Sequence, residues 1–272
     1  MTVIQSIFLG VIQGLTEFLP ISSSGHLVLV PFLLKWDIPP AEAFVFDVLV
    51  QVATLIAVIA FFWKDFYVIL QGFFRGLRRR QPLETQPARL GWYIMLSTIP
   101  AGIAGLLLKD VVEKAFSNPM MTGVALLGTA LLLVVAERVG RRQRTLGEIT
   151  WLDALIIGVF QILALFPGLS RSGSTIAGGM TRDFNRPAAA RFSFLMAVPI
   201  MLMAGILAVI DLTRIPDLGA LLPVFIPGFF AAAVVGYLAI GWLLSFLTRY
   251  SLYYFAAYCA IVGLIVLLFT LN

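Results

Sequence analysis

Six long apolar runs most strongly constrain how this chain can fold. They lie at residues 43–63, 90–108, 119–136, 187–210, 219–244 and 252–271. A helix of about 20 residues crosses the roughly 30 Å hydrocarbon core of a bilayer, so each run matches one span. Charged residues make up only 12% of the chain, about half the share found in soluble domains. The sequence therefore predicts an all-α polytopic membrane protein, because helices satisfy their own backbone groups in lipid.

Two further apolar segments, residues 2–35 and 151–181, are interrupted near their middle by Pro, Gly and Ser. The interruptions read LPISSSGH and FPGLSRSGST, and they leave halves that are too short to span a bilayer. Irregular backbone is tolerated at membrane depth only where protein or a water-filled cavity surrounds it. Each segment is therefore predicted to form a re-entrant helix hairpin.

The two interrupted segments also resemble each other. The stretch GVIQGLTEFLPISSSG at 10–25 aligns without a gap on GVFQILALFPGLSRSG at 158–173. The identical pairs are Gly10/Gly158, Val11/Val159, Gln13/Gln161, Leu15/Leu163, Phe18/Phe166, Ser22/Ser170, Ser24/Ser172 and Gly25/Gly173. We predict one membrane domain of two repeats, about 1–136 and 151–272, joined by a basic cytoplasmic loop at 137–150. Each repeat holds one hairpin and three transmembrane helices.

Basic residues predict the orientation. Residues 64–90 carry six Lys and Arg, 137–148 carry four and 181–191 carry three. The loops at 109–114 and 211–217 are neutral or acidic overall. The positive-inside rule places the basic group in the cytoplasm, so the first hairpin is reached from the outer face. Three crossings per repeat then invert the second repeat relative to the first, as in many transporters. The net charge of +5 is spread over short loops and does not predict nucleic-acid binding.

The first interruption carries acid–base groups. Gln13 and Glu17 share one helix face. An ionised Glu in a membrane helix is expected to face a cavity or a partner, and the alternative is a Glu that reaches the interface from a helix end. His26 is the only histidine in the chain, and its ring can transfer protons near neutral pH. The alternative for His26 is a structural histidine satisfied by hydrogen bonds.

Three consecutive hydroxyls precede His26. Any of Ser22, Ser23 and Ser24 could act as a nucleophile if Glu17 or His26 takes its proton. The alternative, which stays open for Ser22 and Ser24, is that they cap a helix at the break.

The second interruption predicts an anion site. Arg171 is a permanent cation at the position equivalent to Ser23, and arginine suits bidentate phosphate recognition. The neighbouring hydroxyls and flexible glycines would add donors around a phosphate. These hydroxyls belong to Ser170, Ser172, Ser174 and Thr175. Alternatively, Arg171 neutralises Glu17, and both roles can hold together. The two tips then predict a phosphate-bearing substrate whose other end is soluble in lipid.

Both motifs resemble those of the undecaprenyl-diphosphatase (bacitracin-resistance) family. The residues that carry the likeness are Gln13-x-x-x-Glu17 with LPISSSGH, and PGLSRSGST at 167–175. The resemblance implies a bacterial cytoplasmic-membrane enzyme that hydrolyses undecaprenyl diphosphate to the monophosphate and recycles this lipid carrier for cell-wall synthesis. It also implies dependence on a divalent cation, Mg²⁺ or Ca²⁺. The family's first motif begins with Glu or Gln, and this chain has Gln13.

The resemblance assigns the site residues. Glu17, Ser23, His26 and Arg171 lie at the family's functional positions and are the predicted catalytic residues. The predicted diphosphate-binding residues are Gln13, Ser22, Ser24, Ser170, Ser172, Ser174 and Thr175. Glu17 is also the candidate metal ligand, because hard carboxylate oxygen suits Mg²⁺ or Ca²⁺. The sequence leaves the attacking group open among Ser23, His26 and water. The expected partners are a long-chain polyprenyl diphosphate and membrane lipids, and no oligomeric state is predicted.

Two other functions fit parts of the pattern. A second lipid-phosphatase superfamily, the acid-phosphatase-like one, also has an SGH element, but its chemistry needs two histidines and this chain has one. A transporter or flippase of a polyprenyl phosphate would suit inverted repeats with broken helices. Transport alone needs no nucleophile–base cluster, so the sequence favours hydrolysis.

Overall fold

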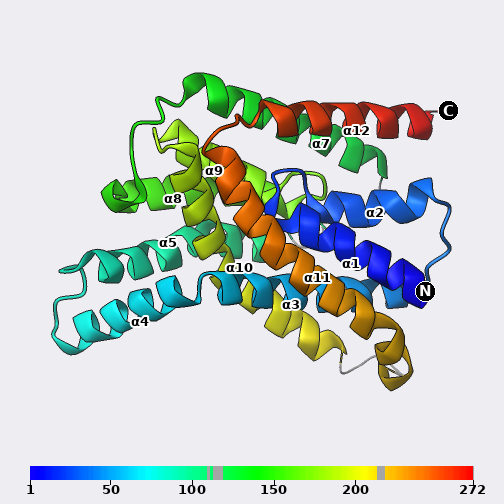
Figure 1. Cartoon of the computed structure of the whole chain (residues 1–272), viewed down its shortest axis with the longest axis horizontal. Helices are drawn as coiled ribbons and strands as arrows, with labels where there is room; N and C mark the ends of the chain where they lie inside the picture. Colours follow the sequence, from blue (N-terminus) through cyan, green and yellow to red (C-terminus); the bar gives the residue numbers. More distant parts are fainter. Residues whose placement is uncertain (109–110, 113–118, 213–217, 272) are drawn as a thin grey trace.

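The computed structural model describes residues 1–108, 111–112, 119–212 and 218–271 (Figure 1). Within these ranges the chain forms helices and no β-strand beyond one isolated bridge. The helices are α1 (Val3–Phe18), α2 (Ser23–Leu33), α3 (Pro40–Phe61), α4 (Trp63–Arg78), α5 (Gln86–Leu107), α7 (Pro119–Val139), α8 (Trp151–Ile162), α9 (Arg171–Thr181), α10 (Arg186–Leu212), α11 (Leu218–Leu247) and α12 (Tyr253–Leu271), with short 3₁₀ turns η1 (Leu146–Glu148) and η2 (Leu163–Leu165).

Six helices in the described ranges are long and apolar enough to cross a membrane: α3, α5, α7, α10, α11 and α12. They coincide with the six apolar runs of the sequence, and the prediction of an all-α polytopic membrane protein is confirmed. Their ends differ from the predicted ones by a few residues; α5 and α7, for example, include Gln86 and Arg138, polar residues outside the apolar runs.

One helix was not expected. Residues 64–90 were predicted only as a basic cytoplasmic loop, whereas α4 follows α3 almost directly and packs against α5. Gly72 permits this contact, since a Cβ there would lie 2.9 Å from Pro87 of α5. Arg75 and Arg78 occupy the last turn of α4, where cations interact favourably with the helix dipole.

Both interrupted segments form helix pairs, α1 with α2 and α8 with α9. In each pair the first helical segment ends two residues before a proline, because proline disfavours helical backbone at the position that precedes it. Leu19 and Phe166 adopt this extended conformation. The second helix of each pair then begins at a serine cap, whose side chain accepts a backbone N–H three residues later.

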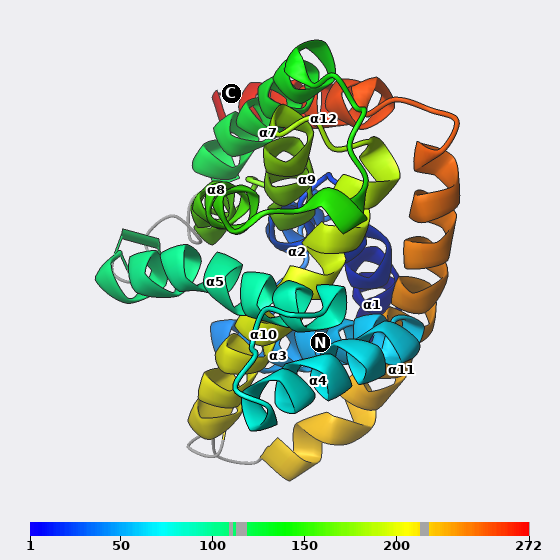
Figure 2. The ribbon, with the colours of Figure 1, turned by 90° about the vertical axis from the view of Figure 1, so that its left-hand side faces the viewer.

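The first helix of each pair packs against a helix from the other half of the chain. Helix α1 packs against α11, and α8 packs against α5 (Figure 2). Close approach explains the repeated glycine: a Cβ at Gly10 would lie 2.2 Å from the Gly228 carbonyl oxygen, and one at Gly158 would lie 2.5 Å from the Ser97 carbonyl oxygen. Such reciprocal packing is what an inverted repeat requires. The inverted relation and the division at 137–150 stay predictions.

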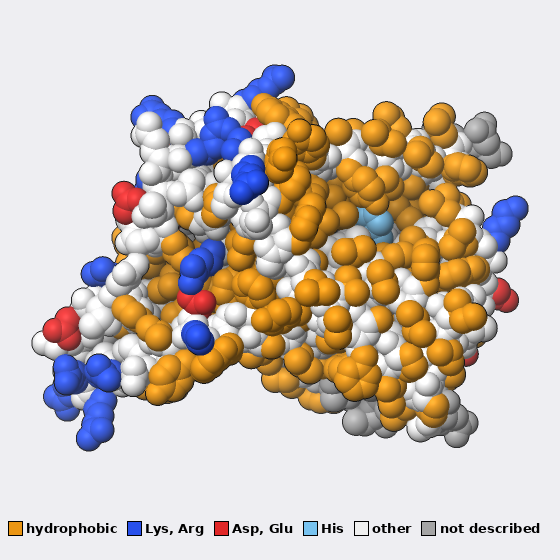
Figure 3. Space-filling view, viewed as in Figure 1, with side chains coloured by type: hydrophobic (Ala, Val, Ile, Leu, Met, Phe, Trp, Pro, Cys, Tyr) orange, Lys and Arg blue, Asp and Glu red, His pale blue; other side chains and the backbone are white. Residues whose placement is uncertain are grey.

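The two ends of the molecule differ in charge. The N- and C-termini lie at the same end (Figure 1). Most of the Lys and Arg side chains visible in Figure 3 gather toward the opposite end. This separation agrees with the orientation predicted from the positive-inside rule. The neutral or acidic loops at 109–114 and 211–217 fall largely outside the described residues.

Candidate active site

The tips of the two hairpins meet at Glu17, on the last turn of α1. Glu17 is 7% exposed. Its Oε2 accepts hydrogen bonds from Ser23 Oγ at 2.6 Å and from Gln13 Nε2 at 3.0 Å, and its Oε1 accepts from Arg171 Nη2 at 3.0 Å. The structure thus brings together a hydroxyl, a carboxylate and a guanidinium. A hydroxyl that donates to a carboxylate is the arrangement of an activated nucleophile.

Ser22 fixes the loop that presents Ser23. Its φ of 71° lies in the left-handed region, which is uncommon for residues other than glycine. Its Oγ accepts from the backbone N–H groups of Gly25 and of Gly168, at 3.3 and 3.1 Å. Ser22 therefore ties the first tip to the second. Ser24 is 3.4 Å from Ser22 Oγ, so among these three serines the bond to Glu17 belongs to Ser23.

The second tip is held in a similar way. Ser170 Oγ accepts from the Gly173 N–H at 3.0 Å, and Ser172 Oγ donates to the Leu19 carbonyl at 2.9 Å. Thr175 Oγ1 donates to the Arg171 carbonyl at 2.8 Å and lies 2.6 Å from Ser193 Oγ. Three of the four predicted phosphate-binding hydroxyls therefore have partners within the protein. The Oγ of the fourth, Ser174, is buried without a partner among the described residues.

Thr129 of α7 supports this tip and was missed by the sequence reasoning. Its Oγ1 donates to the Gly168 carbonyl at 2.8 Å and accepts from the Ser170 N–H at 3.1 Å. Gly168 has a φ of +95°, a conformation that favours glycine. No local signal marks Thr129, because it lies about 40 residues away in an apolar run.

A cavity of about 200 Å³ adjoins the cluster. Glu17, Ser23, Ser170 and Arg171 line it, as do Ser22 and Ser24. The Nε and Nη1 of Arg171 are buried and have no partner among the described residues. Buried donors of this kind ordinarily have a hydrogen-bond partner. Phosphate is a partner that suits arginine, because the hydrogen bonds between them are charge-assisted. The guanidinium therefore holds Glu17 and still offers donors to an anion.

Gln161 also lines this cavity and was not among the predicted site residues. It is the counterpart of Gln13 in the sequence repeat, and that identity could have indicated it.

His26 is placed differently. It is not among the residues that line the cavity. Its Nδ1 lies 2.7 Å from the Ser22 carbonyl oxygen and its Nε2 lies 2.7 Å from the Tyr258 hydroxyl, with the two rings stacked at 5.7 Å. A carbonyl only accepts, so Nδ1 donates to it, and the Nε2 of the neutral ring accepts from Tyr258. His26 thus contacts the backbone of the serine loop, and its acid–base role stays a prediction.

The described residues do not fit a metal ion held by the protein alone. They contain no group of three or more His, Cys, Asp and Glu side chains that could hold one. Both oxygens of Glu17 already accept hydrogen bonds from Ser23, Gln13 and Arg171. The assignment of Glu17 as a metal ligand stays a prediction.

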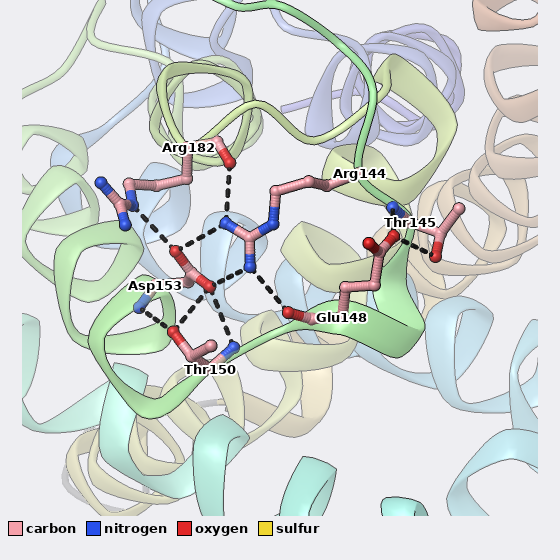
Figure 4. Close-up of polar contacts among 6 residues, drawn as sticks. All are labelled: Arg144, Thr145, Glu148, Thr150, Asp153 and Arg182. Atoms are coloured by element: carbon pink, nitrogen blue, oxygen red, sulfur yellow. Dashed lines mark hydrogen bonds and ion pairs between the residues drawn. The ribbon is translucent and has the colours of Figure 1, made fainter.

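A second polar cluster anchors the α8–α9 hairpin (Figure 4). Asp153, on the first turn of α8, accepts hydrogen bonds from both Nη atoms of Arg144, at 3.1 and 2.7 Å, and from Arg182 Nε at 2.8 Å. Arg144 Nη1 also donates to the Arg182 carbonyl at 2.9 Å. The start of α8, the end of α9 and the preceding loop are thereby joined. Arg144 and Arg182 are committed to this anchor, unlike Arg171.

The same figure shows how the loop before α8 is shaped. Glu148 accepts hydrogen bonds from the backbone N–H and the hydroxyl of Thr145, at 2.7 and 2.8 Å. Both hydrogen bonds lower the pKa of the Glu148 carboxyl, and the one from the backbone N–H has the larger effect. The loop therefore keeps its anionic side chain at a fixed place beside Arg144.

Comparisons with known proteins show which family the chain belongs to. The family model described as bacitracin resistance protein BacA matches residues 6–265. The chain is 44% identical to a protein of Thermomicrobium roseum named undecaprenyl-diphosphatase, over 98% of each chain. A protein of the same name from Moorella thermoacetica is 43% identical over the full length of both chains. Another, from Methanosphaera stadtmanae, is 40% identical over 98% of this chain and 97% of its own. The chain therefore belongs to the bacitracin resistance protein BacA family.

Proposed function

We propose that this protein hydrolyses undecaprenyl diphosphate to undecaprenyl phosphate and inorganic phosphate, and so recycles the lipid carrier for cell-wall synthesis. The observation that carries the proposal is the hydrogen bond from Ser23 to Glu17. Beside it lies Arg171, which binds Glu17 and whose Nε and Nη1 have no partner among the described residues. The name of these relatives, undecaprenyl-diphosphatase, supports the same substrate. Transport of a polyprenyl phosphate is not favoured, because a carrier needs no hydroxyl–carboxylate pair.

The proposed reaction has two steps. Ser23 Oγ attacks the terminal phosphorus while Glu17 takes the hydroxyl proton, and the bridging P–O bond breaks to release the lipid monophosphate. Glu17 passes this proton to the departing monophosphate and is a base again. Water then attacks the phosphoserine and gives a proton to Glu17, the bond between phosphorus and Ser23 Oγ breaks to release inorganic phosphate, and Glu17 returns the proton to Ser23 Oγ. The Nε and Nη1 of Arg171 would stabilise the charge that develops on the phosphoryl oxygens.

Phosphate release from the purified protein in detergent tests the proposal. We expect inorganic phosphate from a long-chain polyprenyl diphosphate, and none from the corresponding monophosphate. Release in detergent needs no second compartment, so it separates hydrolysis from transport. A protein that binds the diphosphate and releases no phosphate, with or without Mg²⁺ or Ca²⁺, contradicts the proposal. Loss of release on addition of a chelator would support the predicted cation dependence.

An apolar groove next to the cavity suits the lipid tail. It has a volume of about 420 Å³ and is lined by Met120, Met121, Val124, Ala125, Gly128, Phe166, Pro167 and Leu169. Leu169 also lines the polar cavity. A diphosphate in the cavity would therefore have its isoprenoid chain directed into an adjoining apolar surface. Burial of that chain would contribute about 0.8 kcal/mol for each methylene removed from water.

Gly128→Leu tests the groove. A Cβ at Gly128 would already lie 3.2 Å from Leu169, so a leucine fills the space. We expect KM for the long-chain diphosphate to rise about tenfold, the equivalent of roughly two lost methylene contacts. KM for a short diphosphate such as farnesyl diphosphate should change less than about twofold. Gly102→Leu is the matched control, because a Cβ at Gly102 meets nothing within 4 Å. Equal changes for both chain lengths would contradict a tail site.

We also propose that the active site opens to the outer face of the cytoplasmic membrane. The basic residues of the loops and of α4 support this orientation. Single cysteines at Asp37 and at Arg79, both exposed, report on opposite ends. In intact cells an impermeant maleimide should label Asp37→Cys, and Arg79→Cys only after permeabilisation. The parent protein is the control, since Cys259 is buried. Labelling of both positions in intact cells contradicts the orientation.

A further inference from the structure

Gln161 has no role in the proposed reaction. It lies at the end of α8 and is 2% exposed. Neither its Nε2 nor its Oε1 has a hydrogen-bond partner among the described residues. An amide buried without partners costs free energy that native proteins rarely leave uncompensated. Because Gln161 lines the cavity beside Glu17 and Arg171, the natural partner is a molecule in that cavity.

Gln13, which is equivalent to Gln161 in the first repeat, has a hydrogen-bond partner that Gln161 lacks among the described residues. Gln13 donates to Glu17 at 3.0 Å and so helps hold the carboxylate. In the second half the position equivalent to Glu17 is Leu165, which is apolar, so Gln161 has no carboxylate to hold. The carboxamide at the end of α8 is thereby left for a ligand.

Arg171 provides a second set of unpartnered donors in the same cavity. Its Nε and Nη1 are buried and unpartnered among the described residues, and it lines the same cavity from the start of α9. The cavity therefore holds a cationic donor and a neutral donor on two different helices. Two separate donor groups suit an anion with two linked phosphates better than a single phosphate, because each phosphate then has a donor of its own.

We propose that Gln161 is a diphosphate-binding residue, whose side-chain NH₂ donates to one phosphate while Arg171 donates to the other. This inference rests on the proposed function and deepens it. The carboxamide oxygen also has no partner among the described residues, and the cavity of about 200 Å³ has room for a water molecule to donate to it. Gln161 touches neither Ser23 nor Glu17 by any hydrogen bond in the described structure, so it binds substrate and does not take part in proton transfer.

Gln161→Leu tests the proposal, because leucine keeps an apolar bulk and removes the amide. The loss of a hydrogen bond to a charged phosphate should raise KM for the diphosphate about tenfold to hundredfold. The kcat should fall less than about threefold, as expected when binding is lost equally in the ground state and the transition state. Gln71→Leu, at an exposed position of α4, controls for the effect of the substitution on purification.

Thermal unfolding separates binding from a structural role. Without ligand, Gln161→Leu should unfold at the wild-type temperature or above it, because an unsatisfied buried amide has been removed. A non-hydrolysable methylene-bisphosphonate analogue of the lipid should raise the unfolding temperature of the wild type more than that of the variant. A KM within about twofold of wild type, or a loss of stability that parallels the loss of activity, overturns the inference.

The two proposals fail separately. A wild-type protein that releases no phosphate, yet is stabilised by the analogue more than Gln161→Leu is, overturns the proposed hydrolysis and keeps Gln161 as a diphosphate-binding residue. A wild-type protein that hydrolyses the diphosphate while Gln161→Leu responds to the analogue equally well overturns the inference alone.

Discussion

Ser23→Ala is expected to abolish phosphate release, lowering kcat by about 10⁴-fold or more. The reason is geometric: Ser23 is the hydroxyl that donates to Glu17, at 2.6 Å, on the wall of the cavity. The measurement is single-turnover phosphate release from a long-chain polyprenyl diphosphate. Ser24→Ala is the matched control, because Ser24 neighbours Ser22 and not Glu17. It should lower kcat by less than about tenfold.

The same variant decides which group attacks phosphorus. With Ser23 as nucleophile, a phosphoserine should accumulate in variants that slow the second step, and mass spectrometry of the quenched protein would detect it. Residual kcat above about a tenth of wild type in Ser23→Ala would point to water as the attacking group, with Ser23 only orienting the phosphate. That outcome would contradict the proposed covalent step and leave Glu17 as the general base.

Glu17 and His26 should behave differently. Glu17→Gln keeps the shape of the side chain and removes the base, so kcat should fall by about 10²–10⁴-fold. His26 contacts the Ser22 carbonyl and Tyr258, and in this geometry it positions the serine loop. Tyr258→Phe removes one of these bonds. If His26 only positions the loop, Tyr258→Phe and His26→Ala should leave the pH dependence of kcat unchanged. Loss of a titration near neutral pH in His26→Ala would support its predicted acid–base role.

The sequence predicted features that depend on local backbone chemistry. Leu19 and Phe166 precede prolines, and the two helix breaks follow from that fact. Ser23 and Glu17 are six residues apart across one break, so their contact needs only a tight turn. The apolar length of each run likewise determines whether a helix can span a bilayer. These expectations required no knowledge of how the helices pack.

Long-range partners were predicted only where a second pattern pointed to them. The pairing of Arg171 with Glu17 crosses 154 residues and was proposed because the repeat places Arg171 opposite Ser23. Tyr258 and Thr129 lie in apolar runs without such a pattern, and their contacts depend on the packing of α12 and α7. Helix α4 was missed for a related reason: its apolar stretch at 66–74 is too short to span a bilayer and is flanked by Lys64, Arg75 and Arg78, which favoured a loop.

Arg171→Lys is expected to lower kcat/KM by about 10²–10³-fold. Lysine keeps the charge, but its three N–H donors share one nitrogen. It therefore cannot reach both Glu17 and the phosphate oxygens as the planar guanidinium does. Loss of such a donor to a developing oxyanion typically costs this much. Steady-state kinetics with the long-chain diphosphate measure the effect. Arg138→Lys, at an exposed position, is the control and should keep wild-type kinetics.

A double-mutant cycle separates the two roles of Arg171. If Arg171 only neutralises Glu17, then Arg171→Met should not weaken binding of the diphosphate analogue once Glu17→Gln has removed the carboxylate. If it also clamps the diphosphate through its Nε and Nη1, which have no partner among the described residues, Arg171→Met should still weaken binding in that background. The readout is the rise in unfolding temperature caused by the methylene-bisphosphonate analogue, which does not depend on turnover. Equal stabilisation of Glu17→Gln and of the double variant would contradict the clamp and leave charge neutralisation as the role of Arg171.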